Sequence, residues 1–257
     1  MFDLFLAELK RNWTIVWRYP LQAASGLILT LILFMTLLAG IRYVAGPAAQ
    51  YGDRMDTMIV GYVLWNTLVF AMGEIASGLE GEGRIGTLEQ LFLSPMTGTR
   101  IFLTRALAGQ TVVLTFNVVI LGILLLVTGT RLHFPAALFL PLATAVCACY
   151  GIGLTLGALA LVYKRVAPII QMTQFALIAL IMVPFESWQP TSANPAFLLP
   201  LVPSAALLRD LMARGEALDP FVFAMAVGNA VLFLGIGALL FRVAERAAKR
   251  QGLLATY

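Results

Sequence analysis

Three glycines in the stretch EGEGRIGTLEQLFLSP, residues 80–95, have the spacing of a phosphate-binding loop. Gly81, Gly83 and Gly86 form the pattern G-x-G-x-x-G, and residues 81–87 read as a P-loop whose last position holds Thr87 in place of lysine. A P-loop uses that lysine to contact the β- and γ-phosphates of a nucleotide. The sequence therefore first raises the question of whether this chain binds a nucleotide.

The surroundings of these glycines argue against a nucleotide. A dinucleotide-binding loop follows a hydrophobic strand and opens the helix of a βαβ unit, whereas this stretch follows a long apolar segment. Carboxylates crowd the same region, and their charge repels phosphate. They are Glu74, Glu80, Glu82 and Glu89. We expect no nucleotide on this chain.

The other residues that could do chemistry are isolated from suitable partners. The single histidine, His133, lies in a short polar stretch, and the sequence contains no H-E-x-x-H. Cys147 and Cys149 form a C-x-C pair with no histidine or acidic residue nearby, which favours buried thiols over a metal site. An intramembrane serine protease or zinc peptidase is therefore not predicted, and we expect neither catalytic residues nor a metal site.

The composition indicates that a membrane is the main solvent of this protein. The 257 residues are 60% hydrophobic and 12% charged, and their mean hydropathy is +0.90. A soluble domain could not bury so much apolar surface. A helix needs roughly 20 apolar residues to cross about 30 Å of hydrocarbon. We predict a single-domain, all-α integral membrane protein, residues 1–257, with six transmembrane helices at about 21–41, 57–78, 106–128, 136–163, 166–188 and 220–241.

Two features describe the second half of the predicted bundle. Little more than Lys164 and Arg165 separates the fourth and fifth segments, which predicts a tight helical hairpin. Gly153 and Gly157 form a G-x-x-x-G step in the fourth segment, and Gly151 precedes them. Small residues at this spacing let another helix approach closely, so packing explains these glycines.

Basic residues are divided unevenly between the two sides of the predicted bundle. Twelve of the 17 Lys and Arg residues lie on the side of the termini. Short loops rich in Lys and Arg stay in the cytoplasm. We therefore place both termini in the cytoplasm. The net charge of +4 is a topology signal, so we do not expect a nucleic-acid partner.

Residues 1–20 predict an amphipathic helix that lies in the headgroup region. Apolar residues recur on one face, while charges interrupt the run too often for a signal peptide. We expect Trp13 and Trp17 to anchor this helix to membrane lipids and Pro20 to break it before the first span. The pattern of residues 1–20 fits either a simple membrane anchor or a helix with a regulatory or docking role. The apolar face is Phe2, Phe5, Leu6, Leu9, Trp13 and Val16.

The glycine-containing stretch continues into a second predicted amphipathic helix, on the cytoplasmic side between the second and third spans. Its apolar residues repeat at helical spacing, and Pro95 is expected to end it. A helix resting on the membrane surface and a docking helix for a cytoplasmic protein both fit this pattern. The apolar residues are Ile85, Leu88, Leu91 and Phe92.

At these residues the chain resembles the ABC-2 type permeases, the membrane subunits of bacterial ATP-binding-cassette exporters for drugs and polysaccharides. The matching residues are G-T-L-E-Q-L at 86–91 and Ser94-Pro95, directly after the second span. A second landmark is a proline-rich external segment, with Pro190, Pro195, Pro200 and Pro203, that leads to L-R-D-L at 208–211. Ile85 departs from the family pattern, which often has an acidic residue before the glycine.

The resemblance implies a permease in a bacterial cytoplasmic membrane that forms a dimer, either with itself or with a close paralogue. It also implies two copies of a cytoplasmic ATPase subunit, which would hold ATP and Mg²⁺, so this chain itself would carry no cofactor. The stretch around residues 84–92 would be the coupling helix that contacts the ATPase. Its candidate coupling residues are Arg84, Gly86, Thr87, Leu88, Glu89, Gln90, Leu91 and Phe92.

Polar side chains inside the spans are candidates for a transport path, because each costs free energy in hydrocarbon unless it faces water or another helix. The family's path runs at the dimer interface along the first, second and fifth spans, which favours Asn66, Gln171 and Gln174, with Glu186 at the end of the fifth span. Bridging between helices is the alternative for each residue.

The resemblance implies export of a hydrophobic or amphipathic substrate, such as a drug or a lipid. Export of a lipid-linked polysaccharide and ATPase-independent transport or scrambling are the alternatives. Residues 186–207 are apolar and interrupted by proline, and we expect them to form a re-entrant external segment that covers the mouth of the path.

Overall fold

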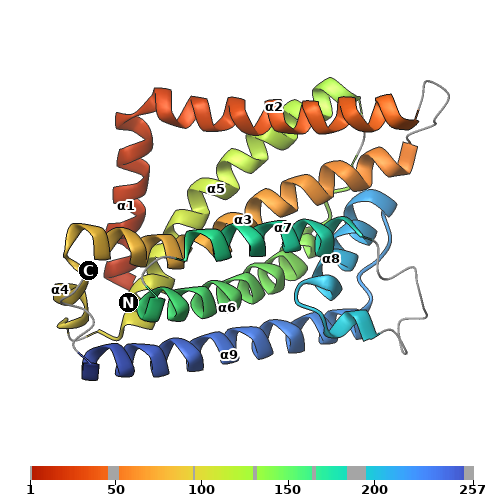
Figure 1. The fold of residues 1–257 in the computed structure, drawn as a ribbon. Helices are drawn as coiled ribbons and strands as arrows, with labels where there is room; N and C mark the ends of the chain where they lie inside the picture. The colour runs from red at the N-terminus through yellow and green to blue at the C-terminus, as the bar shows by residue number, and fades with distance from the viewer. Residues whose placement is uncertain are drawn as a thin grey trace.

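The computed structural model describes residues 2–45, 52–94, 96–129, 132–163, 166–183 and 195–251. Over these residues the chain is helical and contains no strand (Figure 1), which confirms the all-α prediction for this part. The helices are α1 (Phe2–Arg18), α2 (Pro20–Ala45), α3 (Gly52–Ile85), α4 (Leu88–Phe92), α5 (Gly98–Thr128), η1 (Ala136–Leu138), α6 (Phe139–Tyr163), α7 (Ala167–Met182), η4 (Pro195–Leu198), α8 (Val202–Arg209), η5 (Asp210–Arg214) and α9 (Pro220–Gln251).

Five helical segments in the described residues are long and apolar enough to cross a membrane, as a multi-pass membrane protein requires. They correspond to the first, second, third, fourth and sixth predicted spans. In place of the fifth, α7 has 16 residues and is about 24 Å long. Residues 184–188 of that prediction, Glu186 included, lie outside the described residues. The five segments are Pro20–Gly40, Met58–Ile85, Gly98–Thr128, Ala136–Tyr163 and Pro220–Arg250.

The helices form a bundle with a distinct terminal end (Figure 1). Helices α2, α3, α6, α7 and α9 run along a common direction, and α5 crosses them at an angle. Helix α1 stands across this direction at one end, and α4, the start of α1 and the end of α9 lie at that same end, which we call the terminal end. The interfacial placement of residues 1–20 stays a prediction.

Glycines bring the central helices into close contact, as predicted from the G-x-x-x-G step. Helix α6 packs between α3 and α9. A Cβ added to Gly153 would lie 2.6 Å from the carbonyl oxygen of Met72 on α3, closer than real Cβ atoms approach. A Cβ added to Gly237 on α9 would lie 2.1 Å from the carbonyl oxygen of Gly151. The backbones therefore meet directly, and no larger residue fits at these positions.

Two predicted helix boundaries require correction, whereas the predicted break before the first span is confirmed. Helix α1 ends at Arg18 and α2 begins at Pro20, where the fixed φ and missing N–H of proline are tolerated. Helix α3 continues to Ile85, beyond the predicted end of the second span, and α5 begins at Gly98, before the predicted start of the third. Long helices extend past the hydrocarbon because their polar ends are solvated by headgroups and water.

The end of the bundle opposite the termini, the far end, is closed by a short buried helix. Every residue of α8 is buried, against α9, α6 and α3 among others. Asn229 of α9 holds the chain before α8, because its amide accepts a hydrogen bond from the Leu201 backbone N–H at 3.3 Å and donates to the Leu199 carbonyl at 3.0 Å. Within the predicted external segment, residues 195–198 form η4 and residues 202–207 belong to α8, whereas residues 186–194 lie outside the described part.

Candidate functional site

The turn between α3 and α4 holds the sequence G-T-L-E-Q-L at the terminal end of the bundle. Gly86 adopts φ +79°, a left-handed conformation that glycine reaches without steric cost. The Thr87 hydroxyl donates to the Glu82 carboxylate, and the Thr87 backbone N–H donates to the Glu82 carbonyl at 3.1 Å. These bonds fix the turn. The predicted continuous amphipathic helix over 85–92 is wrong, because Gly86 ends α3 before α4 begins.

Two predicted anchors of the coupling helix, Leu88 and Phe92, pack inward. Leu88 is 1% exposed and Phe92 is 6% exposed. The Phe92 ring lies 6.4 Å from the ring of Phe102 on α5, and the ammonium of Lys249 on α9 lies 5.3 Å from its centroid. Both side chains therefore belong to the core of this chain and cannot reach a partner. Helical spacing identified an apolar face but not the protein surface that covers it.

Other residues of the turn are accessible and form what we name the tip surface: Arg84, Ile85, Gly86, Glu89, Gln90 and Leu93. Its two large apolar side chains, Ile85 and Leu93, are 77% and 78% exposed. Arg84 pairs with Glu80 at 2.6 Å while most of its side chain stays exposed. Thr87 and Leu91 are half-buried. The tip surface thus combines two exposed apolar side chains with a cation, a carboxylate and an amide.

An ion-pair bridge, Glu8–Arg105–Glu82, joins this turn to α1. Arg105 of α5 contacts Glu8 of α1 through Nε at 2.9 Å and Glu82 of α3 through Nη1 at 2.6 Å. Glu8 also pairs with Arg11 at 2.9 Å. Glu8, assigned by the sequence pattern to the polar face of α1, is 6% exposed. The sequence shows opposite charges in segments that are expected at the same end of the bundle. It does not show which of these charges pair.

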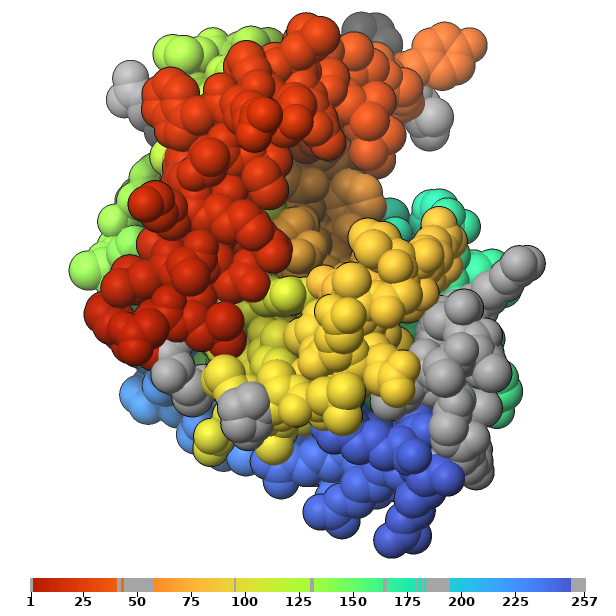
Figure 2. All heavy atoms as spheres, turned by 90° about the vertical axis from the view of Figure 1, so that its left-hand side faces the viewer, coloured from red at the N-terminus to blue at the C-terminus, as the bar shows by residue number. Residues whose placement is uncertain are grey.

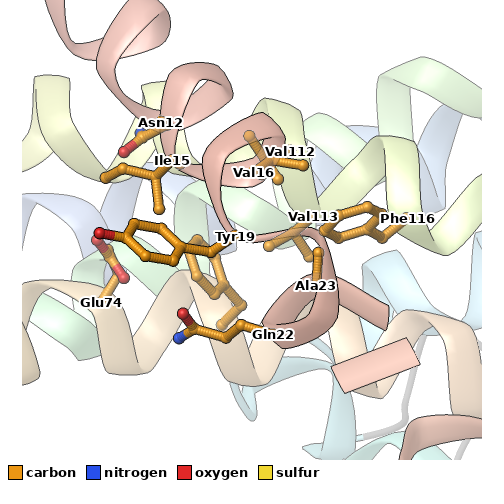
Figure 3. Close-up of a pocket in the computed structure, with 12 residues that line it drawn as sticks. Asn12, Ile15, Val16, Tyr19, Gln22, Ala23, Glu74, Val112, Val113 and Phe116 are labelled. Atoms are coloured by element: carbon orange, nitrogen blue, oxygen red, sulfur yellow. The ribbon is translucent and has the colours of Figure 1, made fainter. Parts of the chain in front are cut away.

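A cavity of about 500 Å³, the elbow cavity, opens where α1 turns into α2. Figure 2, seen from the terminal end, shows the surface hollowed between α1 and α2 on one side and α3 on the other. Figure 3 shows Glu74 and the Tyr19 hydroxyl at one end of the cavity and Val112 and Phe116 toward the other. A second cavity of about 330 Å³ adjoins it and shares part of its wall. The shared residues are Gln22, Ala23, Phe70, Val113 and Phe116.

The structure separates the predicted path residues. Asn66 lines the second cavity and donates a hydrogen bond to the Asn117 side chain of α5 at 2.6 Å, so it also bridges two helices. The Gln174 amide of α7 lies against α3, since a Cβ on Gly73 would be 3.6 Å from it. Gln171 is exposed. Of the predicted path residues that the structure describes, Asn66 lines the second cavity, and Glu74 of the same helix lines the adjoining elbow cavity.

Comparison of the sequence with protein-family models finds no match, and a search of curated proteins finds none either.

Proposed function

We propose that this chain is the transmembrane permease subunit of an ATP-driven exporter of the ABC-2 type, with ATP hydrolysis on a separate cytoplasmic subunit. The observation that carries the proposal is the sequence G-T-L-E-Q-L in the turn and short helix between two long apolar helices, part of which forms the tip surface. In this arrangement the ATPase docks on the tip surface, where Ile85 and Leu93 serve as apolar anchors while Arg84 and Glu89 set orientation.

The proposed subunit crosses a bacterial cytoplasmic membrane six times, at the spans predicted from the sequence, with both termini in the cytoplasm. The side of the basic residues supports this orientation. Two copies pair and bind two ATPase subunits. Reporter fusions test the orientation: an alkaline phosphatase fused after Gly215 should be active, and one fused after residue 251 should be inactive. The reverse result would contradict the proposed topology.

The proposed cargo is a hydrophobic or amphipathic molecule that enters from the inner leaflet. Two adjoining cavities at the level of the α1–α2 turn support this, because both are lined mainly by apolar side chains with a few polar groups. The cavities follow the second span, where the family resemblance places the path. In the dimer, a second copy would complete the path beside α2 and α3.

Co-purification is the direct test of the function. A tagged copy of the full chain, expressed in its native host and extracted in mild detergent, should bring down an ATPase whose turnover rises on reconstitution with the chain. Purified chain that moves substrate across vesicles without ATP or any other subunit would replace this proposal with an ATPase-independent transporter.

A further inference from the structure

We propose that the elbow cavity binds an amphiphile that carries a single positive charge, with its ammonium or guanidinium group at Glu74 and its apolar body directed along α3 toward Asn66. As the exporter's substrate class this rests on the proposed function, whereas the binding site itself stands without it.

The charge of the cavity is the first observation. Twelve residues line it, and Glu74 is the one Asp, Glu, Lys or Arg among them. Within the described residues Glu74 makes no hydrogen bond or ion pair, although its side chain is only partly exposed. A carboxylate held in an apolar wall without a partner costs free energy, and a bound cation removes that cost.

The neighbouring cations are already occupied, which is the second observation. Arg11 and Arg105 are the positive residues whose charges reach Glu74. Arg11 pairs with Glu8, and Arg105 pairs with both Glu8 and Glu82. Each of these two cations is thus paired with a carboxylate other than Glu74. Within the described residues Glu74 itself has no ion-pair partner, so its carboxylate favours a positive ligand.

The shape of the cavity supplies the third observation. Figure 3 shows its polar end at Glu74, Asn12 and the Tyr19 hydroxyl, and its apolar end at Val113 and Phe116. The second cavity continues from that apolar end to Asn66, about 12 Å along α3 from Glu74. A ligand with one polar cationic end and an apolar body of about this length fits both cavities.

The same arrangement disfavours a phospholipid headgroup. In zwitterionic lipids a phosphate lies next to the ammonium group, and Glu74 would repel that phosphate. None of the twelve lining residues is a lysine or arginine that would neutralise it. The site thus suits a compound whose positive charge has no neighbouring anion.

Two matched probes test the charge requirement. Dansyl-diaminododecane carries one free ammonium group, and dansyl-aminododecanol has a hydroxyl in its place. The purified full chain in phosphatidylcholine nanodiscs is titrated with each probe, and energy transfer from the chain's tryptophans to dansyl reports binding, with empty nanodiscs as the blank. We expect the ammonium probe to bind at least about tenfold more tightly than the hydroxyl probe.

Two variants locate the site. Glu74→Gln should weaken the ammonium probe at least about tenfold and change the hydroxyl probe less than about twofold. Glu216→Gln, at an exposed position at the far end, is the matched control and should change neither. Gly26→Leu places a side chain where a Cβ meets nothing within 4 Å, in the wall of the second cavity. It should weaken the dodecyl probe but not its hexyl counterpart.

Equal binding of the two probes, or an unchanged affinity in Glu74→Gln, would overturn the proposal. The unfolding temperature of each variant is measured alongside, and Glu74→Asp, which keeps the charge, should retain most of the affinity if Glu74→Gln is poorly folded. Neither measurement requires an ATPase. Probe binding that depends on Glu74, combined with failure of any ATPase to co-purify with the chain, would support the site and refute the exporter. ATPase coupling without such probe binding would do the reverse.

Discussion

Ile85 and Leu88 separate partner docking from folding at the tip of the molecule. Ile85 is 77% exposed, so its truncation to alanine should change stability by no more than about 0.5 kcal/mol. Leu88 is 1% exposed, and Leu88→Ala removes buried methyl groups and leaves a cavity, at a cost of about 2–5 kcal/mol. Two apolar residues three positions apart are therefore expected to have opposite effects.

The effect of Ile85 should be seen in complex formation. An exposed side chain that becomes an anchor on docking typically contributes about 2 kcal/mol or more when truncated, which corresponds to roughly a 30-fold loss of affinity. The assay reconstitutes each variant with the co-purifying ATPase and measures the ATPase concentration that gives half-maximal stimulation. We expect Ile85→Ala to raise this concentration about 30-fold and to leave the unfolding temperature of the permease unchanged.

The matched control is Leu198→Ala, which truncates a side chain that is 74% exposed at the far end. It should change neither coupling nor stability. Wild-type coupling in Ile85→Ala would refute the tip surface as the docking site. Wild-type stability in Leu88→Ala would refute the conclusion that α4 packs into the core of its own chain.

Three further predictions concern folding. Gly237→Leu should abolish accumulation of monodisperse protein on size-exclusion chromatography, because even a Cβ would lie 2.1 Å from the carbonyl oxygen of Gly151; a normal elution profile would contradict the close α6–α9 contact. Arg105→Met leaves two partly buried carboxylates without their shared cation and should lower the free energy of unfolding by about 1–3 kcal/mol, measured by chemical denaturation in detergent. Asn229→Leu removes the hydrogen bonds that hold residues 197–201 and should speed proteolysis there, as limited digestion with mass spectrometry would detect.

The membrane-spanning helices could be predicted from the sequence because one physical rule dominates them. In hydrocarbon each backbone N–H and C=O must be paired within its own helix, so length and hydropathy suffice to locate a span. The close helix packing at Gly151 and Gly153 could also be predicted, because a glycine on an apolar helix mainly lets another helix approach closely. The helix ends were less accurate, because residues 79–85 extend α3 mainly with glycines and charged residues, which give no apolar signal.

The direction in which the short helix α4 faces could not be predicted. Its apolar residues repeat as they would on a docking helix, yet Phe92 packs on Phe102, and Phe102 packs in turn on Phe241. Phe92 and Phe102 lie on successive helices, α4 and α5, whereas Phe241 comes from α9, near the other end of the chain. Periodicity describes one helix at a time, whereas burial depends on which other helices arrive beside it.

The pairing of charged residues inside and beside the spans could not be predicted from the sequence either. The sequence contains Glu8, Glu74, Glu82 and Arg105 as four charged residues near one side of the membrane, and it does not tell which of them are neutralised. Within the described residues the structure pairs Glu8 and Glu82 with Arg105, and Glu74 lies in a cavity wall without such a partner. An apolar residue at position 74 would give a more stable fold, because an unpaired carboxylate there opposes folding and membrane insertion. The free energy lost at this position is recovered when a cation enters the cavity, and this makes Glu74 the residue through which ligand binding should stabilise the fold.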